Sequence, residues 1–307
     1  MKVAVIGYGH VGKWTVNKIE NTPDLEVSGI VSRRAKKLSK ELDYEVAPDI
    51  DGLDADVGIL ATETEHLFEA TPKILECCDS VDSFDMHHRT QKYFELIDKA
   101  AKKNNRVALY AHGWDPGLFS EMRVIFEAFF PRGETLYEYG INLPSGGVSR
   151  GHSAELNREF SDRIELAVSR TFPKNEESQN VREVTIAKRG DVDEGELIED
   201  VMRHPYFRGD DVSFKFKPLN QVKEYFTEEH SGQVIRRGET RDDIREEGKF
   251  ELILYSNPGF TAQVLVSSVH AIPRMRETFG PGAYNMTQVP PNYYSPKTNE
   301  EIREEFV

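Results

Sequence analysis

Two acidic positions in the first half of the chain have the surroundings of a chemical site. Asp85 follows a short strand predicted over 80–82, and Asp115, preceded by Trp114, follows a strand predicted over 107–110. Open α/β sheets bind ligands beyond the carboxyl ends of their parallel strands, so we expect both carboxylates at one rim. Two carboxylates there could hold an ammonium group and assist the deprotonation that precedes hydride loss from its carbon. They favour an amine over an alcohol, unless Asp115 only caps the turn made with its Pro-Gly neighbours.

A glycine-rich segment supplies a second kind of chemistry. It directly follows a strand predicted over 2–6 and opens a helix predicted over 12–21, and it consists of Gly7, Tyr8, Gly9, His10, Val11 and Gly12. Gly7 permits the tight turn, Gly9 lets a pyrophosphate approach the backbone, and Gly12 lets helix and strand pack closely. The start of the helix offers N–H groups and partial positive charge to the anion. In this context the pattern predicts a dinucleotide site more strongly than a plain strand–helix turn.

The end of the second predicted strand, 25–31, indicates which dinucleotide. Enzymes that use NAD usually carry an acidic residue there to hold the ribose 2′-hydroxyl, whereas this chain has Ser32, Arg33 and Arg34. A hydroxyl and two guanidinium groups would bind a 2′-phosphate through charge-assisted hydrogen bonds. NADP is therefore the predicted cofactor. The alternative is a pair of solvated arginines at a strand end.

The order of elements predicts an α/β protein with an N-terminal Rossmann dinucleotide-binding domain over 1–118. Short apolar runs alternate there with helical patterns, which is expected of a parallel sheet covered on both faces. An α+β substrate and dimerisation domain is expected over 119–257, and 258–307 should complete the first domain. The second domain has longer alternating runs, which predict a mixed or antiparallel sheet. These runs lie at 135–142, 180–187, 212–217 and 250–255.

Three other segments of the second domain carry expectations. Residues 143–153 are rich in Gly and Ser, which is typical of a binding loop. The segments 174–179 and 238–249 are highly charged and are predicted to be exposed.

Composition limits the possible partners. The 307 residues carry 39 Lys+Arg against 53 Asp+Glu, a formal net charge of −14, which does not favour nucleic acid as a ligand. The longest stretch without charged side chains, 252–273, contains Pro258 and His270 and does not predict a membrane span. The two cysteines, Cys77 and Cys78, are adjacent and seldom bridge in that arrangement, which indicates a reducing cytoplasm. No cluster with metal-ligand spacing supports a metal site.

Taken together, these segments resemble the meso-diaminopimelate dehydrogenases, NADP-dependent amino acid dehydrogenases that act at a D-configured centre. The resemblance covers almost the whole chain. The matching segments are Gly7-Tyr-Gly-His-Val-Gly12, Ser32-Arg-Arg-Ala35, Val81-Asp-Ser-Phe-Asp85, Gly113-Trp-Asp-Pro-Gly117, Ser149-Arg-Gly-His-Ser153 and Asn257-Pro-Gly-Phe-Thr-Ala262. The Gly-Trp-Asp-Pro-Gly segment, at its distance behind the Asp-Ser-Phe-Asp segment, is rather specific, whereas many families share the glycine fingerprint.

The resemblance implies a role for each site residue. Asp85 and Asp115 would lie beside the reacting amine, with the indole of Trp114 next to them, and the backbone of Arg150 and Gly151 would cradle the carboxylate of the D-centre. The residues that would anchor the distal L-centre are Thr171, Arg182, His230 and Asn257. A guanidinium, a hydroxyl and an amide together suit a second carboxylate.

Three departures from the family pattern bear on the substrate and leave the cofactor and reaction type untouched. Pro144 stands where the family carries Phe or Trp, and Arg150 stands where Met or Gln is usual. The segment 154–163 also lacks the family's Ile-Pro-Gly turn.

The function implied is the reversible, NADP-dependent oxidative deamination of the D-centre of meso-2,6-diaminopimelate to L-2-amino-6-oxopimelate and ammonia. The resemblance further implies a cytoplasmic homodimer that serves lysine biosynthesis. A first alternative is the same chemistry on another diamino acid or a simple D-amino acid. A second is a non-enzymatic NADPH-binding regulator.

Overall fold

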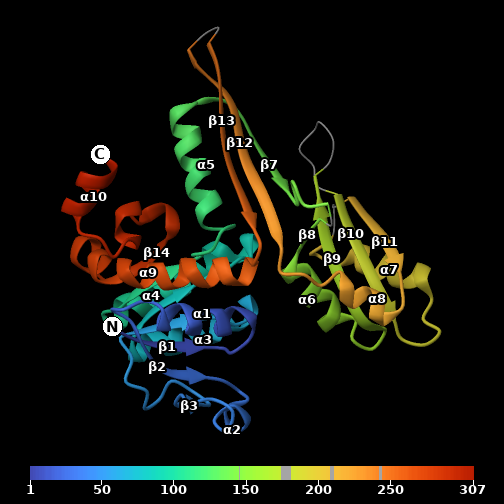
Figure 1. The fold of residues 1–307 in the computed structure, drawn as a ribbon, viewed down its shortest axis with the longest axis horizontal. Coiled ribbons are helices and arrows are strands. Elements are labelled where there is room, and N and C mark those ends of the chain that lie inside the picture. Colours follow the sequence, from blue (N-terminus) through green and yellow to red (C-terminus); the bar gives the residue numbers. More distant parts are fainter. Residues whose placement is uncertain (145, 174–180, 208–210, 242–243) are drawn as a thin grey trace. The chain divides into compact units, whose positions relative to one another are not determined.

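The computed structural model describes residues 1–144, 146–173, 181–207, 211–241 and 244–307. Those residues form two compact units, one of Met1–Val124 with Pro258–Val307 and the other of Ile125–Asn257. A seven-stranded parallel sheet in the first unit and two smaller sheets in the second confirm the predicted fold class (Figure 1). The predicted charged segment 174–179 lies outside the described residues. No described helix is long and apolar enough to cross a lipid bilayer.

The sheet of the first unit has the strand order β14-β6-β5-β4-β1-β2-β3. Its strands are β1 (Lys2–Ile6), β2 (Glu26–Val31), β3 (Val46–Ala47), β4 (Val57–Leu60), β5 (Asp79–Asp82), β6 (Val107–Tyr110) and β14 (Gly282–Asn285). All neighbours pair in parallel, so the carboxyl ends of β5 and β6 meet at one rim, as predicted. The edge strands β3 and β14 are short, and the sequence pattern does not predict them.

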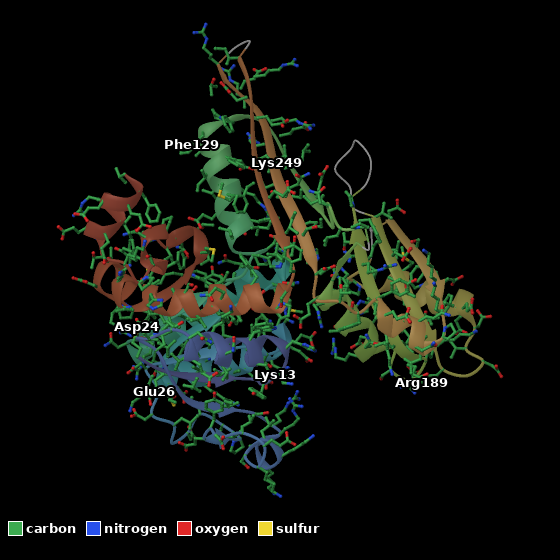
Figure 2. All side chains as sticks on the ribbon, in the orientation of Figure 1. Lys13, Asp24, Glu26, Phe129, Arg189 and Lys249 are labelled. Atoms are coloured by element: carbon green, nitrogen blue, oxygen red, sulfur yellow. The ribbon has the colours of Figure 1, made fainter. Side chains whose placement is uncertain are left out.

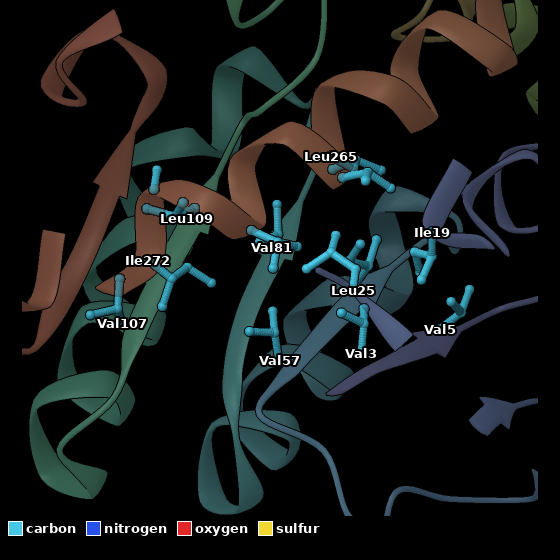
Figure 3. Close-up of a cluster of buried hydrophobic side chains, with 14 of the residues drawn as sticks. Val3, Val5, Ile19, Leu25, Val57, Val81, Val107, Leu109, Leu265 and Ile272 are labelled. Atoms are coloured by element: carbon cyan, nitrogen blue, oxygen red, sulfur yellow. The ribbon is translucent and has the colours of Figure 1, made fainter. Parts of the chain in front are cut away.

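Helices cover both faces of this sheet. The helices of the first unit are α1 (His10–Glu20), α2 (Ala35–Leu38), α3 (Thr64–Cys77), α4 (Thr90–Asn104), α9 (Asn257–Phe279) and α10 (Asn299–Phe306), with short 3-10 turns η1 (His87–Arg89), η2 (Met286–Gln288) and η3 (Pro291–Tyr294). Helix α5 (Leu118–Phe129) begins in the first unit and ends in the second. Leu265 and Ile272 of α9 pack with Val3, Val57 and Val81 of the strands (Figure 3). The opposite face is covered by α3 and α4. Each such side chain contributes about 1.5–3 kcal/mol by burial, so the packing of helices on strands fixes the rim.

The second unit contains a three-stranded and a four-stranded sheet. The first is antiparallel, in the order β13-β12-β7, and consists of β7 (Arg132–Tyr139), β12 (His230–Arg241) and β13 (Ile244–Leu254). The second is mixed, in the order β11-β10-β9-β8, and consists of β8 (Gly147–Val148), β9 (Ile164–Phe172), β10 (Val181–Lys188) and β11 (Asp211–Phe216). The helices of this unit are α6 (Arg150–Glu159), α7 (Glu194–Arg203) and α8 (Leu219–Glu224).

One expectation for this unit was wrong in part, and another was confirmed. The segment 143–153 is not simply a loop, because Gly147 and Val148 form β8 and a helix begins at Arg150. The described residues of the charged segment 238–249 are largely exposed, as predicted, and most of them belong to β12 and β13. Lys249 extends from β13 and pairs with Glu251 at 2.7 Å, so its charge lies on a regular strand (Figure 2).

Candidate active site

The glycine-rich turn between β1 and α1 has the shape that a dinucleotide requires. Gly7 has a φ of 101°, and a Cβ added there would lie 2.5 Å from the carbonyl oxygen of Ala61. A Cβ on Gly12 would lie 2.1 Å from the Gly7 carbonyl oxygen, which no side chain could accommodate. A Cβ on Gly9, by contrast, would meet no atom within 4 Å. Gly7 and Gly12 therefore serve packing, whereas Gly9 leaves open space beside the start of α1, where a pyrophosphate could approach.

The end of β2 places cationic side chains beside this turn. Nη2 of Arg34 donates to the carbonyl oxygen of Tyr8 at 2.9 Å, and the Arg34 amide donates to Oγ of Ser32 at 3.2 Å. Arg33 and Arg34 are exposed, while Ser32 is buried. A hydroxyl and two guanidinium groups thus lie at one strand end and fit the phosphate of a 2′-phosphorylated ribose.

The segments that carry Asp85 and Asp115 leave adjacent strands, β5 and β6. They also approach each other, since a Cβ added to Gly113 would lie 3.7 Å from Cβ of Ser83. Trp114 packs edge-on against Phe119, with ring centroids 5.2 Å apart. Both predicted carboxylates therefore belong to neighbouring segments of the predicted rim.

Asp85 is exposed to solvent but borders protein atoms that displace part of its water. This desolvation raises the pKa of Asp85, while a hydrogen bond from Thr64 and the nearby His87 act in the lowering direction. Oγ1 of Thr64 donates to Oδ1 of Asp85 at 2.5 Å. Thr64 begins α3, 21 residues before its partner, and no local spacing in the sequence connects the two.

Asp115 has a partner that sequence reasoning missed. Nη2 of Arg123 donates to its Oδ1 at 2.7 Å, and the two side chains are only 25% and 9% exposed for Arg123 and Asp115. The pair connects a residue before α5 to one within that helix, at a separation of eight positions. Because helical ion pairs are usually recognised at separations of three or four, this spacing gave no signal.

In the second unit, three residues predicted to bind the distal substrate end converge. Arg182 of β10 faces Thr171 of β9 across the antiparallel pair, and its Nη1 donates to Oγ1 of Thr171 at 3.3 Å. Gly147 pairs with Thr171 in turn, and a Cβ added to Gly147 would lie 2.7 Å from Nδ1 of His230. Strand register therefore assembles a guanidinium, a hydroxyl and an imidazole from three separate strands.

The imidazole of His230 is buried and neutral at physiological pH. Burial lowers its pKa to about 4, and the positive charge of Arg182 acts in the same direction. Nδ1 lies 2.8 Å from the amide nitrogen and 3.0 Å from the carbonyl oxygen of Ser231, so the Ser231 backbone engages this ring nitrogen. A neutral imidazole carries one ring N–H donor and one acceptor nitrogen.

Arg150 and Gly151 open helix α6, as the first-turn residues after Ser149. First-turn N–H groups have no partner within their helix, which suits a carboxylate. The Arg150 side chain is engaged elsewhere: Nη2 donates to the carbonyl oxygen of Thr227 at 3.0 Å, and the guanidinium lies 4.6 Å from the ring of Phe226. It is the backbone of Arg150, then, that suits the predicted cradle.

One predicted site residue and one departure from the family pattern remain. Asn257 is the first residue of α9, and its amide donates to the carbonyl oxygen of Glu228 at 2.8 Å. Pro144, the departure noted above, is exposed.

In the portion of the chain that the structure describes, no group of three or more His, Cys, Asp or Glu side chains is arranged to hold a metal ion.

Comparison with known proteins places these residues in context. Residues 113–256 match the family model of the diaminopimelic acid dehydrogenase C-terminal domain. The meso-diaminopimelate D-dehydrogenase of Acetivibrio thermocellus is 32% identical over 99% of this chain and 96% of its own length.

Solved structures show the same similarity. The DAP dehydrogenase of C. glutamicum in complex with DAP has a TM-score of 0.91 and 27% identity, covering 100% of this chain and 99% of its own. An engineered D-amino acid dehydrogenase bound to NADP+ has a TM-score of 0.89 and 26% identity, with the same coverage of both chains.

Proposed function

Because this chain belongs to the meso-diaminopimelate D-dehydrogenase family, we propose that it catalyses the NADP-dependent oxidative deamination of meso-2,6-diaminopimelate at its D-centre. The products are L-2-amino-6-oxopimelate and ammonia, and the reaction is reversible. The family supports the reaction type, and the residues of the two units support the roles below.

The first unit would bind NADP. Gly7, Gly9 and Gly12 shape the turn at the start of α1, whose N–H groups suit the pyrophosphate. Arg33 and Arg34, with Ser32, would hold the 2′-phosphate. The NADP+ complex of the engineered structural relative supports this choice. When bound, NADP+ supplies the hydride acceptor.

Asp85 and Asp115 would handle the reacting amine. The substrate amine is an ammonium ion at neutral pH, and it must lose a proton before its carbon can give up hydride. Asp85 has a raised pKa and can accept that proton, whereas Asp115 is held by Arg123 and can position the ammonium. Water then attacks the imine carbon of the substrate, and ammonia leaves.

The second unit would select the substrate. The guanidinium of Arg182, the hydroxyl of Thr171 and a ring N–H of His230 can all donate hydrogen bonds, and together they suit a carboxylate. Asn257 would add an amide at the same distal end. The first-turn N–H groups of Arg150 and Gly151 would hold the carboxylate of the D-centre.

The observation that carries this proposal is the convergence of Arg182, Thr171 and His230, because a simple D-amino acid has no second carboxylate to use it. We would measure NADPH formation with the meso, LL and DD isomers of diaminopimelate, with D-lysine and with D-alanine. Turnover restricted to the meso isomer is expected. Equal turnover of D-alanine would contradict the assigned substrate.

Two substitutions test the catalytic assignment in the same assay. Asp115→Asn should lower kcat severely and leave NADPH binding near that of the wild type, because Asp115 belongs to the amine site. Glu127→Gln, on the solvent side of α5, is the matched control and should retain activity. A weak effect of Asp115→Asn on kcat would remove Asp115 from the mechanism.

We also propose that the protein acts as a cytoplasmic homodimer. The second unit exposes large apolar side chains that suit a partner surface, with Phe129 68%, Ile253 40% and Tyr255 77% exposed (Figure 2). Light scattering should give twice the chain mass. A monomer at all concentrations used in the assay would exclude this assembly.

A further inference from the structure

Asp82, at the end of β5, joins the two segments that carry the predicted carboxylates. Its side chain is completely buried. Oδ1 accepts the amide N–H of Phe84 at 2.9 Å and lies 3.4 Å from the amide nitrogen of Ala111. Its own carbonyl oxygen accepts the amide of His112 at 2.9 Å. Asp82 thus forms hydrogen bonds with the backbone on both sides: with Phe84, just before Asp85, and with Ala111 and His112, which lead to Trp114.

The second oxygen of Asp82 is held by a buried tyrosine. Tyr93 of α4 donates its hydroxyl proton to Oδ2 at 2.5 Å. The hydroxyl of Thr71 on α3 lies 2.6 Å from the Tyr93 oxygen and can donate to it, because the tyrosine proton is already used. The Tyr93 ring also stacks on Phe84, with centroids 4.1 Å apart and planes 7° from parallel. Tyr93 therefore fixes both the carboxylate and one of the residues that it binds.

The backbone at the Ala111 contact needs such support. Ala111 has a φ of 56°, a left-handed conformation that residues with a Cβ seldom adopt. A hydrogen bond to its amide helps hold the turn after β6 in that conformation. Phe84 directly precedes Asp85, so its amide contact sets the direction in which Asp85 leaves β5.

We propose that Asp82 is a positioning residue that sets the Asp85 and Asp115 segments relative to each other, and that Tyr93 holds Asp82 in that role. This inference rests on the proposed dehydrogenase function. Asp82 lies behind the rim and acts through the backbone of Phe84, Ala111 and His112.

The charge balance around Asp82 agrees with this role. Burial raises its pKa to about 6, and the negative charge of Asp85 acts in the same direction, while hydrogen bonds from Tyr93, Phe84 and Ala111 oppose both. The Asp82 charge also acts on Tyr110 of β6, whose pKa is raised mainly by burial. The hydrogen bonds thus favour the ionised form, the stronger acceptor for the two amides.

The first test is Tyr93→Phe, which removes the donor and keeps the stacked ring. We expect kcat to fall about 10-fold, because a small misplacement of catalytic groups is costly, while the Kd for NADPH stays within about twofold. The matched control is Tyr284→Phe in the same unit, whose hydroxyl donates to the Phe279 and Gly280 carbonyl oxygens. That variant should keep the wild-type kcat.

A second pair of variants tests Asp82 itself. Asp82→Ser cannot accept from Phe84 and Ala111 together and should lose at least as much activity as Tyr93→Phe. Asp82→Asn keeps an oxygen that can accept both amides and should recover most of that loss. If Asp82→Asn recovers activity, Asp82 acts as a hydrogen-bond acceptor that positions the backbone. If it does not, the negative charge of Asp82 is what the enzyme needs.

A readout that does not depend on turnover keeps the inference separate from the proposed function. In a Trp14→Phe background, Trp114 is the remaining tryptophan, and its emission reports the segment after β6. Tyr93→Phe and Asp82→Ser should shift that emission, whereas Tyr284→Phe should not. If the wild type shows no turnover but these shifts occur, the proposed function fails and the positioning role stands. Unchanged emission, or folded variants with wild-type kcat, would overturn the role.

Discussion

Arg123 donates a hydrogen bond to Asp115 at 2.7 Å, although eight residues separate them. Asp115 is 9% exposed and Arg123 25%, so the pair is largely withdrawn from water. Removing one partner of such a pair leaves a poorly compensated charge in a site with little water. The carboxylate proposed to position the substrate ammonium is thus itself positioned by a cation.

Arg123→Leu should lower kcat about 10-fold, because Asp115 loses its fixed orientation. Arg123→Lys should fall between this variant and the wild type, since a lysine keeps the charge without the planar donor geometry of arginine. Steady-state kinetics with meso-diaminopimelate would measure both. Arg203→Leu removes an exposed ion pair on α7 and serves as the control. Equal effects of Arg123→Leu and Arg203→Leu would argue against the positioning role.

The pH profile should report Asp85. Its pKa is raised mainly by desolvation, so kcat/KM for deamination should fall on the acid side at a pH above the usual Asp range, as the base becomes protonated. Thr64→Val removes a hydrogen bond that stabilises the ionised form, and the acid limb should then move to higher pH. Thr22→Val, which loses only a hydroxyl contact to the Lys18 carbonyl oxygen, should leave the limb in place. If Thr64→Val left the acid limb at the same pH, that limb would report the titration of a group other than Asp85.

Arg182→Met should weaken the binding of the distal carboxylate. The loss of a charged hydrogen bond is worth about 1.5–3 kcal/mol, so KM for meso-diaminopimelate should rise roughly 10- to 100-fold. The pKa of His230 should also rise, because the Arg182 charge helps to lower it, and imidazole NMR signals would show this. Arg163→Met, which breaks an ion pair with Asp200 in the same unit, is the control. An unchanged KM together with an unchanged His230 titration would separate Arg182 from the site.

Buried neutral histidine should make the first unit sensitive to acid. Burial lowers the pKa of His112 from 6.5 to about 4, so the unfolded chain binds its proton first. Stability is therefore lost as pH falls from about 6.5 to about 4. Relative to His112→Asn, the wild type should lose up to about 3 kcal/mol more between pH 7 and pH 4, as measured by urea unfolding. His66→Asn, at an exposed position, is the control and should retain the wild-type pH dependence of stability. If His112→Asn also retained it, the titration of His112 would not explain the acid sensitivity.

Arg34 should decide the choice between cofactors. Arg34→Ala should raise KM for NADP+ about 10-fold and leave NAD+ unaffected, because only NADP+ carries the 2′-phosphate. Lys40→Ala removes an exposed cation from the same region and is the matched control. If the two substitutions affected NADP+ equally, general charge attraction would explain the preference instead.

The sequence predicts the first unit better than the second, and the reason is periodicity. Buried parallel strands such as 2–6 and 107–110 are short apolar runs, and these match β1 and β6. The strand 230–241 escaped prediction because it contains Arg236 and Arg237 although most of its residues are buried. Arg236 is buried by donating to the Phe130 carbonyl oxygen, a contact 106 residues away that no local pattern contains.

The same limit applies to the candidate site. Motifs led us to propose Asp85 and Asp115 as site residues, because turn and strand signals surround them. Thr64, Arg123 and Asp82, which hold or align those carboxylates, could not be recognised, since their importance arises only when distant segments meet. Local sequence patterns can thus suggest candidate reactive groups, whereas the groups that hold them in place are recognised only in the folded structure.

The first unit uses both ends of the numbered chain, since α9 and β14 follow the whole of the second unit. A ribosome therefore delivers residues 1–124, then every residue of the second unit, and only afterwards the helix that covers one face of the first sheet. When synthesis reaches residue 257, the second unit has all of its residues, whereas the first unit still lacks the apolar side chains of α9 that pack on its sheet. On the ribosome the middle of the chain can therefore mature first, and nucleotide-binding competence should be acquired late in synthesis.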